Sequence, residues 1–248
     1  MIELKSHAEV EKIRQAGVIV ARVLEDMGNI IKPGVTTAEL DTRAKELIES
    51  SGAKAAFKGY RGFPGHICAS VNEVVVHGIP GQRVLEESDI VGIDVGVKLN
   101  GYFADAAATF AVGQISEKAG RLMRATKESL TLAIETATKG RKVSDISNVI
   151  ETFIHSKGYS VVHEFVGHGI GRQLHEDPQI PNFGPPGQGP ELKPGLVLAI
   201  EPMINMGRSD IRVKSDGWTA ITRDGSLSAH YEHTILVTEN SAEILTKL

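Results

Sequence analysis

Residues 90–112, IVGIDVGVKLNGYFADAAATFAV, contain the pattern that decides the fold of the first half of the chain. Two apolar runs flank Leu99-Asn100-Gly101, which is typical of the turn in a β-hairpin. Asp94 and Asp105 lie on either side of this turn, eleven residues apart. Because that separation is odd, both side chains are expected on one face of the hairpin, directly opposite each other or on a near diagonal.

The two carboxylates would repel each other, and their apolar or small neighbours would add the cost of lost hydration. Three arrangements remain open. One acid is protonated, or a cation lies between the two, or both side chains lie on the solvated face of an ordinary hairpin. A metal ion is the simplest answer for a buried pair.

Two pairs of amphipathic helices are predicted, one before the hairpin and one after it. In the first pair, Ser6-x-x-Glu9 reads as a capping box, Lys32-Pro33-Gly34 ends the first helix, and the second helix runs to Gly52. The second pair matches the first at a constant offset of 106 residues: Gly34 with Gly140, Leu40 with Ile146, Leu47 with Phe153, and Gly52 with Gly158. This spacing indicates two related halves, about 1–115 and 116–248, unless two unrelated helix pairs match by chance.

β-rich sequence follows each helix pair. Strands are expected in residues 67–77, 89–97, 101–112, 160–166, 196–203, 218–222 and 230–237. Helix pairs followed by strands, twice over, predict an α+β fold with antiparallel sheets packed together and helices outside. The proline- and glycine-rich residues 178–194 predict a long loop at a functional site. No separable linker is evident, so we expect residues 1–248 to form a single domain.

Three further candidate ligands lie in the second half. Glu201 closes the apolar run 196–200, Glu232 precedes a predicted strand, and His168 lies in the glycine-rich loop 167–171. Each alone has an ordinary structural explanation. Together with the two aspartates they give four carboxylates and one imidazole, whose charge two divalent cations would offset while lowering the pKa of a bridging water. This oxygen-rich set suits manganese, iron or cobalt, and zinc stays open.

Composition limits the classes of protein to consider. Hydrophobic residues make up 41% and charged residues 23% of the 248 residues, as in folded globular proteins. No apolar run approaches the ~20 residues of a membrane span, and the N-terminus does not read as a signal peptide, so we expect a cytoplasmic protein. The net charge of −4 gives no case for nucleic acid as the main partner, and Cys68, the single cysteine, cannot form an internal disulfide. Residues 163–168 fail the HExxH spacing and residues 167–174 fail GxGxxG.

Several motifs give the chain a family resemblance over nearly its whole length. IDVGVKLNGYFADAAATF, VGHGIGRQLHE, LAIEPM and AHYEHTILV resemble the segments that carry the metal ligands of type I methionine aminopeptidases. The resemblance implies a pseudo-twofold pita-bread fold and removal of the initiator methionine from nascent chains when the second residue is small. It implies that Asp94 is a bidentate ligand of one metal and that Asp105 and Glu232 bridge both metals. His168 and Glu201 would bind the other metal.

The same resemblance assigns roles to the surrounding residues. His175 would stabilise the tetrahedral oxyanion, His77 in NEVVVHGIP would hold the scissile amide, and Glu201 would pass a proton to the leaving amine. The methionine pocket would have aromatic and polarisable walls, formed by Phe57, Tyr60, Phe63, Cys68, Leu174 and Trp218. Ordinary core packing is the alternative for these wall residues.

Two further implications concern the surroundings of this pocket. Phe57, Phe63 and Leu174 depart from residues found in relatives, so we expect an altered pocket shape that still prefers methionine. A monovalent cation is expected near three other positions: Asn72, Val74 and Ser228.

Nascent polypeptide N-termini are the expected partner of a monomeric enzyme that contacts the ribosome transiently, with no membrane and no nucleic-acid substrate. A proline-specific aminopeptidase or prolidase is the nearest alternative, because it shares the five ligands, but such enzymes usually carry an additional N-terminal domain. A metal-free binding protein on the same fold is the alternative from another class, and such a protein would have lost ligands.

Overall fold

The computed structural model describes residues 2–248 and opens with two helices, α1 (His7–Ile30) and α2 (Thr37–Ser50). Each begins with a capping box, in which the N-cap N–H donates to the glutamate three residues later, at 2.9 Å in α1 and 2.7 Å in α2. Gly34, with φ of 93°, makes the turn between them in a conformation that favours glycine. Both helices predicted for the first half are confirmed.

The predicted hairpin is also confirmed. β4 (Ile90–Leu99) and β5 (Tyr102–Ala111) pair in antiparallel register along their whole length. Asn100 and Gly101 form the turn with positive φ angles of 50° and 85°, as a tight two-residue hairpin requires. Two further strands extend this sheet by pairing with β4: β1 (Lys54–Ala55) and β2 (Cys68–Val71).

The second half repeats the helix pair with α3 (Glu117–Thr136) and α4 (Val143–Ser156). α2 and α4 have 14 residues each and begin at positions 37 and 143, 106 residues apart. In both halves the glycine that precedes the second helix donates its N–H to a leucine carbonyl oxygen: Gly34 to Leu85 and Gly140 to Leu192. The correspondence is therefore one of geometry as well as of residue type.

Short strands follow α4. The largest sheet of the second half has the order β15-β14-β9-β7-β8, with all neighbours antiparallel. Its strands are β7 (Gly167–Gly169), β8 (Glu176–Ile180), β9 (Val197–Ile200), β14 (His233–Val237) and β15 (Ala242–Ile244). Two three-stranded sheets contain β6 (Ser160–Val161), β10 (Met203–Asn205) and β13 (Ser228–His230), and β3 (Val74–Val76), β11 (Ile211–Val213) and β12 (Ala220–Thr222).

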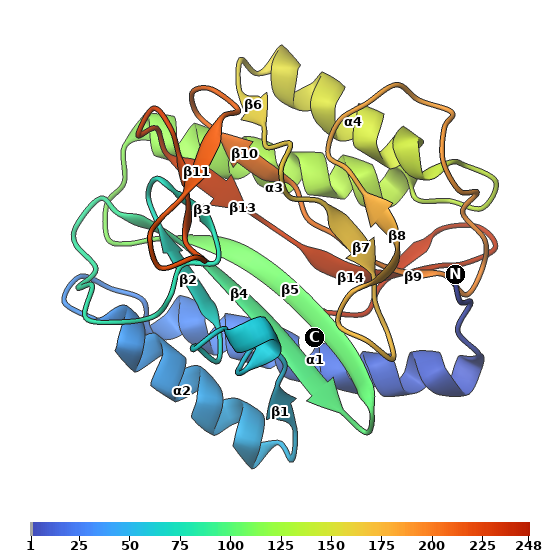
Figure 1. The fold of residues 1–248 in the computed structure, drawn as a ribbon, viewed down its shortest axis with the longest axis horizontal. Coiled ribbons are helices and arrows are strands. Elements are labelled where there is room, and N and C mark those ends of the chain that lie inside the picture. Colours follow the sequence, from blue (N-terminus) through green and yellow to red (C-terminus); the bar gives the residue numbers. More distant parts are fainter. Residues whose placement is uncertain (1) are drawn as a thin grey trace.

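The sheets lie between the two helix pairs, with α1 and α2 on one side and α3 and α4 on the other (Figure 1). One buried cluster packs α1 and α2 against β4 and includes Ile13, Met27 and Ile93. A second packs α3 and α4 against β9 and includes Leu122 and Ile146. This layered α+β arrangement agrees with the predicted fold class.

A seam joins the two halves between β5 and the segment that links β13 to β14. Ala107 and Glu232 exchange backbone hydrogen bonds of 3.3 and 2.9 Å across it. On either side of this pair a threonine hydroxyl bonds to both the N–H and the carbonyl oxygen of one opposing residue: Thr109 with His230, and Thr234 with Asp105. The two threonines are equivalent under an approximate twofold axis through the seam, and so are Asp105 and His230.

The prediction for the surroundings of His168 was wrong, because this residue lies in a strand, β7, and not in a glycine loop. The glycines allow close packing here, because a Cβ at Gly167 or Gly169 would collide with the backbone of a neighbouring strand. A register shift between His168 and Gly169 marks a bulge. β8 also occupies the beginning of the stretch that was predicted to be a loop.

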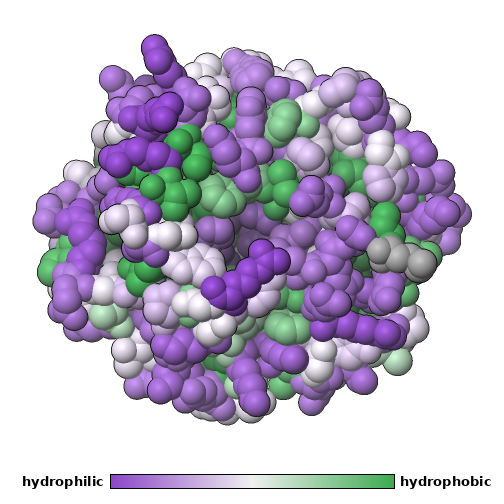
Figure 2. Space-filling model, viewed as in Figure 1, coloured by the Kyte–Doolittle hydropathy of each residue, from purple (hydrophilic) through white to green (hydrophobic). Residues whose placement is uncertain are grey.

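Within residues 2–248, none of the helices has both the length and the apolar character needed to cross a bilayer. The face in Figure 2 mixes hydrophilic and hydrophobic residues around a hollow near its centre.

Candidate metal centre and substrate cavity

The five predicted ligands come from five places in the chain and converge at the seam. Asp94 lies on β4 and Asp105 on β5. His168 lies on β7, Glu201 directly follows β9, and Glu232 lies between β13 and β14. Each half of the chain therefore contributes to one site.

The two aspartates lie on a diagonal of the hairpin, as predicted. Asp94 is paired with Ala107, and Asp105 is paired with Gly96. The carboxylates therefore share one face of the sheet, two positions apart on opposite strands.

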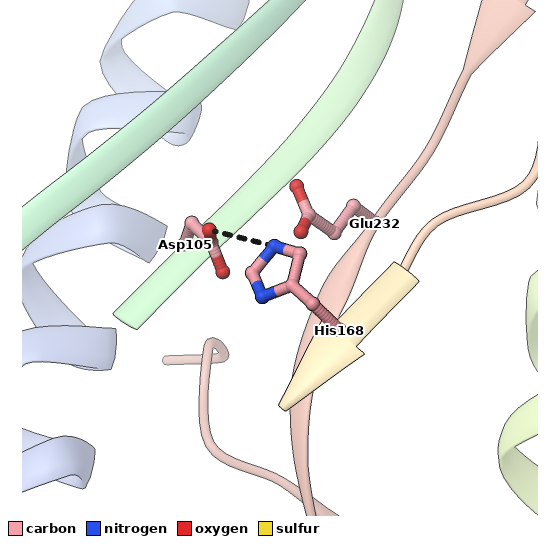
Figure 3. Close-up of side chains that lie close together, drawn as sticks. All are labelled: Asp105, His168 and Glu232. Atoms are coloured by element: carbon pink, nitrogen blue, oxygen red, sulfur yellow. Dashed lines mark ion pairs between the residues drawn. The ribbon is translucent and has the colours of Figure 1, made fainter. Parts of the chain in front are cut away.

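Asp105, His168 and Glu232 lie close together (Figure 3), and each offers a ligand atom within 4.8 Å of the others. His168 Nε2 lies 3.7 Å from Asp105 Oδ2 and 3.5 Å from Glu201 Oε1. His168 Nδ1 bonds to the Gly169 carbonyl oxygen at 2.9 Å, so Nδ1 carries the proton and the lone pair of Nε2 faces the carboxylates.

Burial and mutual repulsion disfavour the ionised carboxylates. Loss of hydration, followed by the charges of the other acids, raises the pKa of Asp94, Glu201 and Glu232 well above the ordinary range. Burial raises the pKa of Asp105 to about 7, against the lowering effect of His175 and of a hydrogen bond from Thr234. Burial lowers the pKa of His168 to about 4, which keeps its imidazole neutral.

A divalent cation fits these side chains. The buried oxygen Oδ1 of Asp94 has no hydrogen-bond partner within residues 2–248. Uncompensated carboxylate oxygens beside a neutral imidazole nitrogen are the donor set that divalent transition metals bind in proteins. The cluster can therefore exchange its unfavourable protons for metal ions as the pH rises.

A cavity of about 270 Å³ opens onto this cluster. All eight predicted substrate-binding residues line it: Phe57, Tyr60, Phe63, Cys68, His77, Leu174, His175 and Trp218. Phe63, Cys68 and Leu174 are nearly fully buried, and the Trp218 ring packs edge-on against Phe63 with ring centroids 5.2 Å apart. The walls on this side are therefore apolar, aromatic and sulfur-containing.

His77 and His175 both line the cavity but pack against different neighbours. The His77 ring packs edge-on against Phe165 at 5.1 Å between centroids, and its backbone has a positive φ of 58°. His175 lies 4.3 Å from the His168 ring, and its Nδ1 is 2.8 Å from the Tyr60 hydroxyl. Burial lowers the pKa of both histidines to about 4, so each is a neutral hydrogen-bonding group near pH 7.

Sequence reasoning missed three residues at this site. Phe165 and Arg61 line the cavity, and His230 Nε2 lies 3.7 Å from Glu201 Oε2. His230 could have been found, because it lies two residues before Glu232 and strand alternation places both on one face. No pattern in the sequence pointed to the other two.

Two of the three residues proposed near a monovalent cation lie together. The Ser228 N–H donates to the Asn72 carbonyl oxygen at 2.9 Å, and the Asn72 side chain bonds to Asp89 at 2.7 Å. Val74 begins β3, two residues after Asn72.

A family model described as metallopeptidase family M24 matches residues 11–239. The chain belongs to metallopeptidase family M24. This chain is 51% identical to a methionine aminopeptidase of Clostridium acetobutylicum over 247 residues, which is 99% of each chain. It is 51% identical to methionine aminopeptidase 1 of Bacillus subtilis over 248 residues, the whole of both chains. The crystal structure of a methionine aminopeptidase from Thermotoga maritima matches the whole chain with a TM-score of 0.99 and 48% identity.

A similar fold occurs in a solved prolidase structure. A prolidase from Pyrococcus furiosus matches 99% of this M24 chain with a TM-score of 0.82 and 26% identity. The match covers 65% of the prolidase chain, which is therefore longer. The methionine aminopeptidases match in length as well as in fold.

Proposed function

We propose that this M24 chain is a methionine aminopeptidase, which removes the initiator methionine from nascent polypeptides when the second residue is small. The observation that carries the proposal is the cavity itself, because side chains that could bind metal lie beside aromatic and sulfur-containing walls in one cavity. Such walls suit a thioether side chain held next to a hydrolytic centre. The likeness to proteins named methionine aminopeptidase over the full length supports the same substrate.

Two divalent metal ions, cobalt, manganese, iron or zinc, are the proposed cofactors. Asp94 would be a bidentate ligand of one ion, Asp105 and Glu232 would bridge both, and His168 and Glu201 would bind the other. The unpaired Asp94 oxygen and the raised pKa values of the carboxyl groups support this assignment, since both indicate missing positive charge. Such ions polarise a carbonyl group and lower the pKa of a water molecule.

The chain's own side chains hold the substrate and move protons. The Tyr60 hydroxyl can donate to Nδ1 of His175, which leaves a proton on Nε2 for the oxygen that becomes negative during attack. His77, which also lines the cavity, would hold the scissile amide. Glu201 would carry a proton to the leaving amine, for which a carboxyl group with a raised pKa is suited.

Further features of the proposal rest on the family resemblance. Residues 1–248 would act as one catalytic domain with halves of about 1–115 and 116–248, in the cytoplasm, as a monomer that contacts the ribosome transiently. A monovalent cation would bind near Asn72, Val74 and Ser228.

Methionine release from Met-Ala-Ser tests the function. The protein is stripped of metal with a chelator and titrated without oxygen with Mn(II), Co(II), Fe(II) or Zn(II). We expect no release from the stripped protein and release that rises with added metal. Glu232→Gln should abolish this release, whereas Glu243→Gln, in strand β15 and outside the cavity, should retain it.

The opposite results would redirect the assignment. Release of the first residue only from peptides with proline in second position would favour a proline-specific enzyme. No release from either class of peptide with any of the four metals would favour a binding protein.

A further inference from the structure

His175 lies on a tight turn, residues 170–175, that connects β7 to β8, and Glu176 closes this turn. Oε1 of Glu176 accepts the N–H of Arg172 at 2.7 Å and the N–H of Gln173 at 3.0 Å. The carboxylate of one residue therefore holds the backbone on which the neighbouring His175 is placed.

The second oxygen of Glu176 is bound by Lys5, which lies in the N-terminal arm, the residues 2–6 that precede α1. Lys5 Nζ lies 2.6 Å from Glu176 Oε2, and the Lys5 side chain is only 2% exposed. The arm is itself held by the backbone, because the Lys5 N–H donates to the Gly195 carbonyl oxygen at 2.7 Å. A Cβ at Gly171 would collide with the Lys5 side chain, so the arm and the turn are in close contact.

A buried lysine of this kind needs an explanation beyond stability. Moving an ammonium group out of water costs free energy, and an apolar pair of the same volume often stabilises a fold equally well. What the ion pair adds is a fixed geometry, because the carboxylate must face the ammonium group with one oxygen and the turn with the other.

This geometry bears on the position of the His175 ring. The Tyr60 hydroxyl, 2.8 Å from Nδ1, orients the His175 ring. How far the ring reaches into the cavity depends on the backbone of the turn. A displacement of about 1 Å in a group that contacts a transition state can lower the rate about 100-fold.

We propose that Lys5, acting through Glu176, is a positioning residue that holds His175 at the distance needed to stabilise the oxyanion. The inference rests on the proposed aminopeptidase function. Lys5 itself does not line the cavity, and its ammonium group contacts Glu3 and Glu176 rather than the metal-binding side chains.

Steady-state kinetics of Lys5→Met on Met-Ala-Ser test the proposal. We expect kcat to fall about 10- to 100-fold with KM changed less than about threefold, because His175 contacts the transition state more strongly than the ground state. Arg14→Met is the control, since it also breaks an ion pair between the N-terminal region and a distant segment, at Glu243, and should keep kcat within about twofold.

A double-mutant comparison separates positioning from general damage. In a His175→Ala background, Lys5→Met should lower kcat no further, because the group that it positions is already absent. An equal further loss in that background would overturn the proposal. If Lys5→Met does not fold, Glu176→Gln replaces it, since a glutamine oxygen can still accept the two turn N–H groups without the charge that binds Lys5.

NMR of the ¹⁵N-labelled histidine side chains gives a readout that does not need activity. In the metal-free protein, Lys5→Met should shift or broaden the His175 ring signals and leave those of His66 and His155 unchanged. Wild-type kcat together with unshifted His175 signals in the folded variant would refute the positioning role. Failure of the wild-type protein to release methionine would instead refute the proposed function.

Discussion

Thr234→Val removes one hydroxyl group from the seam between the halves. Thr234 Oγ1 accepts the Asp105 N–H at 3.1 Å and lies 2.8 Å from the Asp105 carbonyl oxygen, and the side chain is fully buried. Valine has nearly the same shape but leaves both backbone groups of Asp105 without this partner. Each unsatisfied buried group costs about 1–3 kcal/mol, so the loss of two such partners should lower the free energy of unfolding by about 2–6 kcal/mol.

Urea unfolding of the metal-free protein measures this loss. Thr234→Ser is the matched control, because it keeps the hydroxyl and removes one methyl group, at a cost of about 1 kcal/mol. In a chain of this length 1 kcal/mol corresponds to roughly 2–4 °C in Tm, so Thr234→Val should melt at least about 4 °C below the wild type. If the serine variant is as unstable as the valine variant, the hydroxyl does not join the halves and the reasoning is wrong.

Three further predictions concern the cavity. Burial lowers the pKa of His77 from 6.5 to about 4, so its contribution to stability is complete above pH 6.5 and is lost as the pH falls towards 4. Glutamine does not titrate, so in His77→Gln the free energy of unfolding should fall by up to about 3 kcal/mol less than in the wild type between pH 6.5 and pH 4. Unfolding measured across this pH range tests it, and the same pH dependence in both proteins would contradict the prediction. Asp105→Asn should abolish metal-dependent methionine release. It should also raise the Tm of the metal-free protein at pH 8 by a few degrees, because it removes a buried charge. A lower Tm would argue against charge repulsion in the cluster. Met-Ala-Ser should be cleaved at least about tenfold faster than Met-Leu-Ser, since a bulky second side chain would meet the wall of the metal site, and equal rates would rule out the expected specificity.

Features governed by local sequence could be predicted. The capping residues before α1 and α2 and the glycines after them mark helix ends by chemistry that acts within a few residues. The hairpin at Asn100 is equally local, because the turn fixes the register of both strands. That register is sufficient to predict that Asp94 and Asp105 share one face of the sheet.

Features governed by pairing between distant parts of the chain could not be predicted from the sequence. β7 is three residues long and contains two glycines, so it has neither the alternation nor the β-branched residues that indicate a strand. Its neighbours β8 and β9 determine its conformation, and they come later in the chain. Arg61 and Phe165 reach the cavity for the same reason, through packing that no nearby residue indicates.

The matched hydroxyl groups of the seam show how a nearly symmetric frame can hold an asymmetric site. Thr109 and Thr234 make the same bonds in the two halves, but the residues that they hold differ, with Asp105 in one half and His230 in the other. The two equivalent positions therefore carry a carboxylate in one half and an imidazole in the other, so the donor atoms on the two sides of the axis differ in kind. A frame with approximate twofold symmetry can in this way hold unlike donor atoms at matched positions, which two identical halves could not do.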